Sequence, residues 1–144
     1  MDDNKLLLRL SKLSLPQVKS KAKVAFQKFC RLRDANEPCI SCGVESAKFD
    51  GGHFYKAELY TSLMFDEMNC HKQCSYCNSY LAGNLICYYQ NLEHRIGKEN
   101  LTKLVERAKL DKQVDAFGGK PPKLFYIEKY LEYKEKIRIL KDNN

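Results

Sequence analysis

Four cysteines stand in two pairs, each with two residues between its members: Cys39, Cys42, Cys74 and Cys77. Each short knuckle turns two thiolates toward one ion, and two such pairs at this separation are typical of a zinc site. Four thiolates saturate the tetrahedral ion and leave no open position for water. The spacing therefore predicts a structural zinc that fixes the segment between the two pairs.

This segment, together with the residue that follows the second pair, carries side chains suited to phosphodiester hydrolysis. His53 can activate water as a general base near neutral pH. Such an imidazole needs an oxygen that accepts its second N–H, and Asn69 suits that orienting role. The charge that develops on the phosphate calls for Mg²⁺ or Mn²⁺ with oxygen ligands. Asn78 offers a carbonyl oxygen and Asp50 is the nearest carboxylate, so both are candidate ligands.

Each of these residues also has a plainer interpretation. His53 could be a zinc ligand or a surface residue, and Asp50 could simply shape a turn. His71, three residues before the second pair, could shape the backbone or contact substrate. It could also complete the Mg²⁺ site, because the position directly before His53 is Gly52 and supplies no acid.

The elements that must position these residues are mostly helical. Ser14 and Gln17 form a capping-box pattern with Pro16 in the first turn, which predicts a basic helix that ends near residue 36. Extended segments are expected at 47–50 and 53–56, joined by a Gly51-Gly52 hairpin turn. A short helix follows the second cysteine pair, and apolar spacing predicts further helices over 84–96, 101–108 and 123–141.

A hairpin followed by a helix and pinned by zinc is the ββα-metal arrangement of HNH-type nucleases. We therefore expect a mostly helical α+β fold with a zinc-stapled, HNH-like core between N-terminal and C-terminal helices. The 144 residues fit one domain. Its predicted parts are an N-terminal arm (1–15), the basic helix (16–37), the zinc-bound core (38–97) and a C-terminal helical region (98–144).

The net charge of +7 is concentrated at the start of the chain. Residues 1–36 hold nine Lys or Arg against three Asp or Glu, a net charge of +6. This distribution favours binding to phosphates, although a solvated basic helix would have the same composition and basicity does not separate DNA from RNA. The candidate nucleic-acid-binding residues are Lys19, Lys23, Lys28, Arg31 and Lys72.

Seven cysteines and the absence of a signal-like or membrane-spanning apolar run favour a reducing setting without membrane association. We therefore expect a cytoplasmic protein. A symmetric substrate would favour a homodimer, but no segment of the sequence specifies one.

Several motifs together resemble the phage NinG/Rap family over roughly residues 14–100. They are Arg31-Leu-Arg-Asp34, Pro38-Cys-Ile-Ser-Cys-Gly43, Asp50-Gly-Gly-His-Phe54, Phe65-Asp-Glu-Met-Asn-Cys-His-Lys-Gln-Cys74, Cys77-Asn78, Gly83-Asn84, Tyr89 and Arg95-Ile-Gly97. The resemblance implies a Mg²⁺- or Mn²⁺-dependent recombination endonuclease, encoded by a phage or prophage, that acts on branched DNA such as Holliday junctions and D-loops. The competing hypotheses are a non-catalytic zinc module that binds nucleic acid or a replication partner, and an RNA-directed HNH nuclease.

Overall fold

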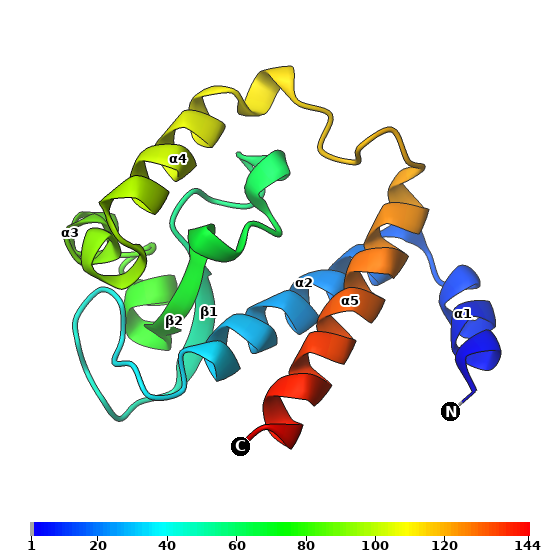
Figure 1. The fold of residues 1–144 in the computed structure, drawn as a ribbon, viewed down its shortest axis with the longest axis horizontal. Helices are drawn as coiled ribbons and strands as arrows, with labels where there is room; N and C mark the ends of the chain where they lie inside the picture. The colour runs from blue at the N-terminus through cyan, green and yellow to red at the C-terminus, as the bar shows by residue number, and fades with distance from the viewer. Residues whose placement is uncertain (1) are drawn as a thin grey trace.

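The computed structural model describes residues 2–144, and in this part of the chain α-helices surround a two-stranded antiparallel sheet (Figure 1). The helices are α1 (Asp3–Ser11), α2 (Leu15–Arg33), α3 (Leu85–Ile96), α4 (Lys98–Lys109) and α5 (Pro122–Asp142). The strands are β1 (Phe49–His53) and β2 (Cys70–Cys74). Short turns of 3₁₀-helix are η1 (Thr61–Leu63), η2 (Glu67–Asn69) and η4 (Asp111–Gln113), and η3 (Tyr76–Tyr80) is π-helical. The predicted mostly helical α+β class is confirmed.

Helix α2 begins as its sequence predicts. The Ser14 hydroxyl accepts a hydrogen bond from the Gln17 backbone N–H, and the Gln17 side chain accepts one from the Ser14 N–H at 2.8 Å. This reciprocal capping box satisfies two backbone donors that would otherwise lack partners. The helix then presents one buried face to the protein interior: Val18, Ala22, Phe26, Phe29 and Cys30.

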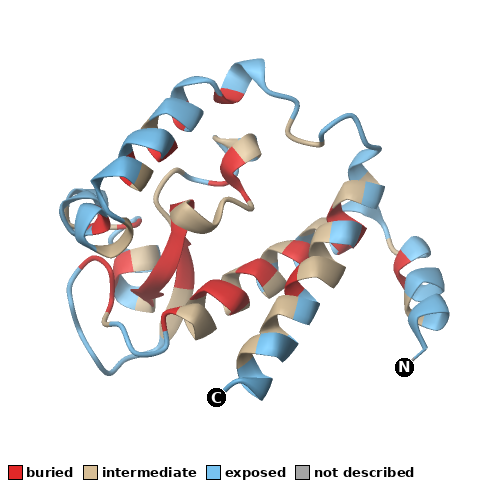
Figure 2. Ribbon diagram, in the orientation of Figure 1, coloured by how far each residue is buried: buried red, intermediate tan, exposed pale blue. Residues whose placement is uncertain are grey.

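Helices α2 and α5 lie side by side and form the longest helical contact of the molecule (Figure 1). Near the start of α2, its small apolar residues join Tyr126 and Ile127 of α5 in one hydrophobic cluster. Further along, the rings of Phe26 and Tyr133 meet edge to face with centroids 4.9 Å apart. Figure 2 shows buried residues along α2, which lies between α5 and the sheet. Leu10 of α1 joins the same interior, so the predicted N-terminal arm contains a helix that packs on the core.

The predicted hairpin turn at Gly51-Gly52 is wrong, because both glycines lie inside β1. This strand pairs with β2 in antiparallel register, from Phe49 opposite Cys74 to His53 opposite Cys70. Close packing explains both glycines. A Cβ atom on Gly51 would lie 2.6 Å from the Gln27 carbonyl oxygen of α2, and one on Gly52 would lie 1.9 Å from Oε1 of Gln73.

A sixteen-residue connection, 54–69, joins the two strands in place of the expected two-residue turn. A second hydrophobic cluster holds this connection against helices α3 and α4: Ile40, Leu63, Tyr88, Leu92, Leu101, Leu104 and Ala108. Among residues 2–144, no helix is long and apolar enough to cross a membrane.

Candidate metal centre and neighbouring polar site

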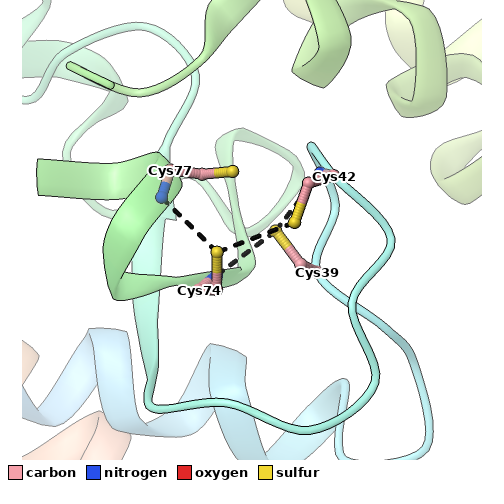
Figure 3. A group of neighbouring side chains, drawn as sticks. All are labelled: Cys39, Cys42, Cys74 and Cys77. Carbon is pink, nitrogen blue, oxygen red and sulfur yellow. Dashed lines mark hydrogen bonds between the residues drawn. The ribbon is translucent and has the colours of Figure 1, made fainter. Parts of the chain in front are cut away.

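The four predicted zinc ligands converge at one end of the sheet (Figure 3). Their Sγ atoms all lie within 4.8 Å of one another, and those of Cys42 and Cys74 are 3.7 Å apart. A tetrahedral site with Zn–S bonds of about 2.3 Å has sulfur–sulfur edges of about 3.8 Å. The cluster can therefore hold a metal such as zinc. Within residues 2–144, it is the one group of three or more His, Cys, Asp or Glu with such proximity.

Backbone amides pre-arrange these sulfur atoms. The N–H groups of Cys42 and Cys74 both point at Sγ of Cys39, at 3.5 and 3.3 Å. Burial opposes ionisation of Cys39, but these amide donors outweigh it and lower its pKa to about 7. The side-chain amide of Asn84 lies 3.4 Å from Sγ of Cys77. The sequence predicts no role for Asn84, because an amide–sulfur contact across six intervening residues follows no known spacing pattern.

Asp50 and Asn78 meet beside the cysteine cluster. The Asn78 amide donates a hydrogen bond to Oδ2 of Asp50 at 3.1 Å. This bond joins β1 to η3, in which Asn78 directly follows Cys77. One carboxylate and one amide are oxygen-bearing groups of the kind that Mg²⁺ takes from proteins, with waters and substrate phosphates completing its shell. The donor types therefore fit the predicted ion, and Asp50 and Asn78 are the residues that would hold it.

His53 ends β1 and packs against Phe26 of α2, with ring centroids 5.7 Å apart. Its Nε2 lies 2.8 Å from the carbonyl oxygen of Met64. A carbonyl can only accept, so Nε2 carries the proton of the neutral ring and Nδ1 carries the lone pair. Burial lowers the pKa of His53 against the opposing effect of the Met64 bond. The imidazole is therefore neutral at pH 7 and able to accept a proton.

Asn69 does not orient His53, and the prediction of that role is wrong. The Asn69 side chain is fully buried, accepts from the Tyr55 N–H at 2.8 Å, and donates to the carbonyls of Tyr55 and Leu63. These bonds tie both ends of the 54–69 connection together. Asn69 thus positions the connection that carries the Met64 carbonyl, and that carbonyl holds the imidazole.

His71 lies in the interior, which argues against its predicted place in a Mg²⁺ site. Its ring is 2% exposed, and Nδ1 lies 3.1 Å from the Tyr88 hydroxyl. That hydroxyl donates its own proton to the Gly52 carbonyl at 2.7 Å, so Nδ1 of His71 is the donor to it. Burial lowers the pKa of His71 to about 3. The residue connects both strands to α3, in agreement with the backbone-shaping interpretation.

The candidate site residues divide between the two faces of the sheet. Side chains alternate along a strand, so Asp50 and His53 point to opposite sides of β1. Their contacts agree, because His53 packs on α2 whereas Asp50 bonds Asn78 in η3. The structure therefore brings Asp50 and Asn78 together but does not place His53 beside them.

Among the candidate nucleic-acid-binding residues, Lys19 and Lys23 share one ionic partner, and Lys23 lies close enough to His53 to help lower its pKa. Their Nζ atoms contact the two carboxylate oxygens of Glu58, at 3.1 and 3.2 Å. Lys28 lines a shallow groove of about 350 Å³ between α2 and α5. These three side chains remain at the surface, where they can meet phosphates.

The prediction for Lys72 is wrong, and Arg31 is also engaged internally. Lys72 is 9% exposed; its Nζ donates to the carbonyls of Ala35 and Glu37 and lies 4.1 Å from the ring centroid of Phe49. Arg31 donates to the Phe49 carbonyl at 3.2 Å. Both side chains fasten the sheet to the end of α2.

Arg33 and Asp34, two motif residues for which the sequence predicts no individual role, also connect the end of α2 to the sheet. Arg33 donates to the carbonyls of Glu67 and Cys70 at 2.7 and 2.6 Å, and pairs with Asp34. Asp34 also accepts from the Lys72 backbone N–H at 3.0 Å. The end of α2 is thereby bonded to the backbone of β2, which explains why an Arg-Asp pair stands there.

The fold and this centre define a class: a small, mostly helical α+β protein built around a cysteine cluster that can hold zinc. Within that class, the chain belongs to the NinG family. It matches the family model described as "Bacteriophage Lambda NinG protein" over residues 4–142.

Curated relatives carry the same family name. The chain is 47% identical to "Protein ninG" of Escherichia phage 933W over 79 residues, which are 54% of this chain and 39% of that protein. It is 46% identical to "Protein ninG" of Escherichia phage lambda over 79 residues with the same shares, and 47% identical to that of Salmonella phage P22 over 77 residues, 53% and 38% of the two chains. The chain thus spans about two-fifths of the length of the curated relatives it matches. No solved structure matches the chain significantly.

Proposed function

We propose that this NinG-family protein is a metal-dependent DNA endonuclease that hydrolyses phosphodiester bonds in branched recombination intermediates, such as Holliday junctions and D-loops, in the host cytoplasm. Family membership supports this proposal through the recombination role that the NinG/Rap resemblance implies. The basic surface of α2 supports it through charge, because Lys19, Lys23 and Lys28 can follow a phosphate backbone.

The observation that carries the proposal is the state of His53. Its Nε2–H is held by the Met64 carbonyl, and burial lowers its pKa, so Nδ1 offers a lone pair at neutral pH. An imidazole held in one tautomer and kept neutral is what a general base for water activation requires. Lys23 lies near it and would hold the phosphate that the water attacks, and Lys19 shares Glu58 with Lys23.

Asp50 and Asn78 would hold the divalent cation, whose positive charge would bind a DNA phosphate. Their own contribution is a carboxylate and an amide joined by a hydrogen bond between β1 and η3. Because they lie on the opposite face of the sheet from His53, we expect the cation to bind a phosphate other than the one beside the base.

Cleavage of four-way, forked and linear DNA, with Mg²⁺, with Mn²⁺ and without added divalent ion, tests this function. His53→Ala should lower the rate at saturating DNA by about 10²–10⁴-fold, the usual contribution of a general base. His94→Ala is the matched control, since His94 is exposed on α3 and distant in sequence from both faces of the site. Wild-type turnover by His53→Ala would exclude this residue as the base.

A non-catalytic zinc module that binds nucleic acid is the second candidate function. The separation of His53 from Asp50 and Asn78 favours it, because binding needs no assembled catalytic group. It predicts tight binding to branched DNA with no cleavage under any of the metal conditions. The RNA-directed alternative predicts cleavage of RNA versions of the same substrates instead.

A further inference from the structure

Two tyrosines stand exposed on η3, on either side of Asn78. The rings of Tyr76 and Tyr80 are stacked with centroids 5.0 Å apart and an interplanar angle of 17°. Tyr76 is 59% exposed and Tyr80 is 77% exposed. Aromatic rings are among the groups that folding most strongly favours burying, so a stacked pair left in solvent needs an explanation.

The stretch of chain that carries this pair has no charged residue of its own. Residues 73–92 contain no Asp, Glu, Lys, Arg or His, although charged residues make up 30% of the whole chain. The large exposed apolar residues of this stretch, which we call the aromatic platform, are Tyr76, Tyr80, Leu81, Leu85, Ile86 and Tyr89. An uncharged cluster of this kind on a highly charged protein is typical of a binding surface.

The aromatic platform adjoins the cysteine cluster through Cys77 of η3, and its backbone has an unusual conformation. Ala82, Gly83 and Asn84 all have positive φ, at 51°, 100° and 41°. Alanine rarely adopts this conformation, and such strain persists only where the surroundings impose it. Here the Gly83 N–H bonds the Cys77 carbonyl at 2.8 Å, and the buried Gln73 side chain holds the Gly83 carbonyl at 2.6 Å. A π-helical turn followed by such a bend is often found at functional sites.

We propose that the aromatic platform stacks unpaired bases at the branch point of the DNA substrate. Every base offers a flat π face, so stacking on exposed tyrosines recognises single-stranded or unpaired nucleotides without reading sequence. The residues of the platform carry no charge themselves, and the nearby Asp50 carboxylate accepts a hydrogen bond from Asn78. Lys56 lies at the edge of the platform, with Nζ 3.3 Å from the Ala82 carbonyl, and supplies a cation for the adjoining backbone. The proposal rests on the proposed function, whose substrate it specifies.

This stacking also gives the platform a part in choosing where the protein binds. Stacking on its exposed rings needs a base that is free of a pairing partner. Linear duplex DNA has no unpaired base to offer and loses this contact, whereas forks and junctions with open branch points keep it.

DNA binding by the zinc-loaded 144-residue chain tests the proposal in buffer without Mg²⁺ or Mn²⁺, so that cleavage plays no part. The probes are a forked DNA with 2-aminopurine at an unpaired position beside the branch and a fully paired duplex of equal length. The wild type should quench the unpaired 2-aminopurine and prefer the fork. Tyr80→Ala should weaken fork binding by about fivefold to 100-fold and lose the quenching, with little change for the duplex. Tyr80→Phe should restore both.

Ile139→Ala, at a 44% exposed apolar position on α5, is the matched control and should leave binding to both probes unchanged. Unchanged fork binding and quenching by Tyr80→Ala would overturn the proposal and leave a protein partner as the occupant of this surface. Failure of Tyr80→Phe to restore binding would also overturn it, because a stacking role needs only the ring. A wild type that cleaves no DNA but shows the fork preference would reject the nuclease function and retain the platform.

Discussion

Replacing Gly52 with alanine should destabilise the folded protein through one identifiable contact. The new Cβ would lie 1.9 Å from Oε1 and 2.9 Å from Cδ of Gln73. Gln73 is fully buried, and its Nε2 donates to the Ser41 hydroxyl at 2.9 Å and to the Gly83 carbonyl at 2.6 Å. The side chain therefore cannot turn away without breaking both bonds. Overpacking of this kind costs about 1–3 kcal/mol of unfolding free energy.

Urea unfolding of the zinc-loaded protein measures this cost, and a double-mutant cycle assigns it. Gln73→Ala removes the clashing atoms, so Gly52→Ala should be less costly in that background. Contacting residues typically show coupling energies of about 0.5–3 kcal/mol, and we expect at least about 1 kcal/mol here.

Gly51→Ala is the matched control for the cycle. Its new Cβ would meet the backbone of Gln27 at 2.6 Å, so Gln73→Ala should bring it no relief. A hairpin turn would instead make both alanine substitutions costly through backbone conformation, whatever residue stands at position 73. Equal penalties for Gly52→Ala in the two backgrounds would refute the strand assignment and its explanation of the glycine.

Two further predictions concern the metal centre and the buried histidine. Cys42→Ser should lose bound zinc and most of the folding cooperativity, because the binding energy of a structural zinc contributes directly to the folding energy. Cys87→Ser is the control and should keep one zinc per chain. Metal analysis and circular dichroism check both variants, and a folded Cys42→Ser protein with full zinc content would contradict the prediction. The pKa of His71 is about 3 in the folded chain and about 6.5 when unfolded, so below pH 6.5 the unfolded chain binds a proton that the folded chain does not, and stability falls as the pH falls. Urea unfolding measures the free energy of unfolding at pH 6.5 and at pH 5. Between these two pH values it should fall by about 2 kcal/mol more in the wild type than in His71→Gln. An equal fall in both proteins would show that His71 is not the group responsible.

The features that the sequence predicts well depend on short spacings. The capping box of Ser14 and Gln17 lies within four residues, and each zinc knuckle lies within four as well. Such patterns specify their local geometry whatever the rest of the chain does. The convergence of the two knuckles followed from the chemistry of the ion, which needs four ligands at once.

Strand pairing and burial depend on distant residues and were predicted poorly. Gly51-Gly52 is compatible with a tight turn and with close approach of a helix, and only the position of Gln27 on α2 separates the two. The β2 sequence, Cys-His-Lys-Gln-Cys, has no apolar alternation, yet all five residues are buried. The sequence predicts Lys72 to be a surface cation, because the carbonyls that accept hydrogen bonds from its Nζ lie 35 and 37 residues earlier in the chain.

The pairing of α2 with α5 has a consequence for how the protein is made. The apolar face of α2 is covered by Tyr126, Ile127 and Tyr133, which belong to the last helix of the chain. A ribosome that adds about 5–20 residues per second needs roughly 5–20 s to synthesise the approximately 90 residues between the end of α2 and the start of α5. During that interval the growing chain lacks the residues of α5 that cover Phe26 and Phe29, so these two rings lack part of their packing until α5 has been made.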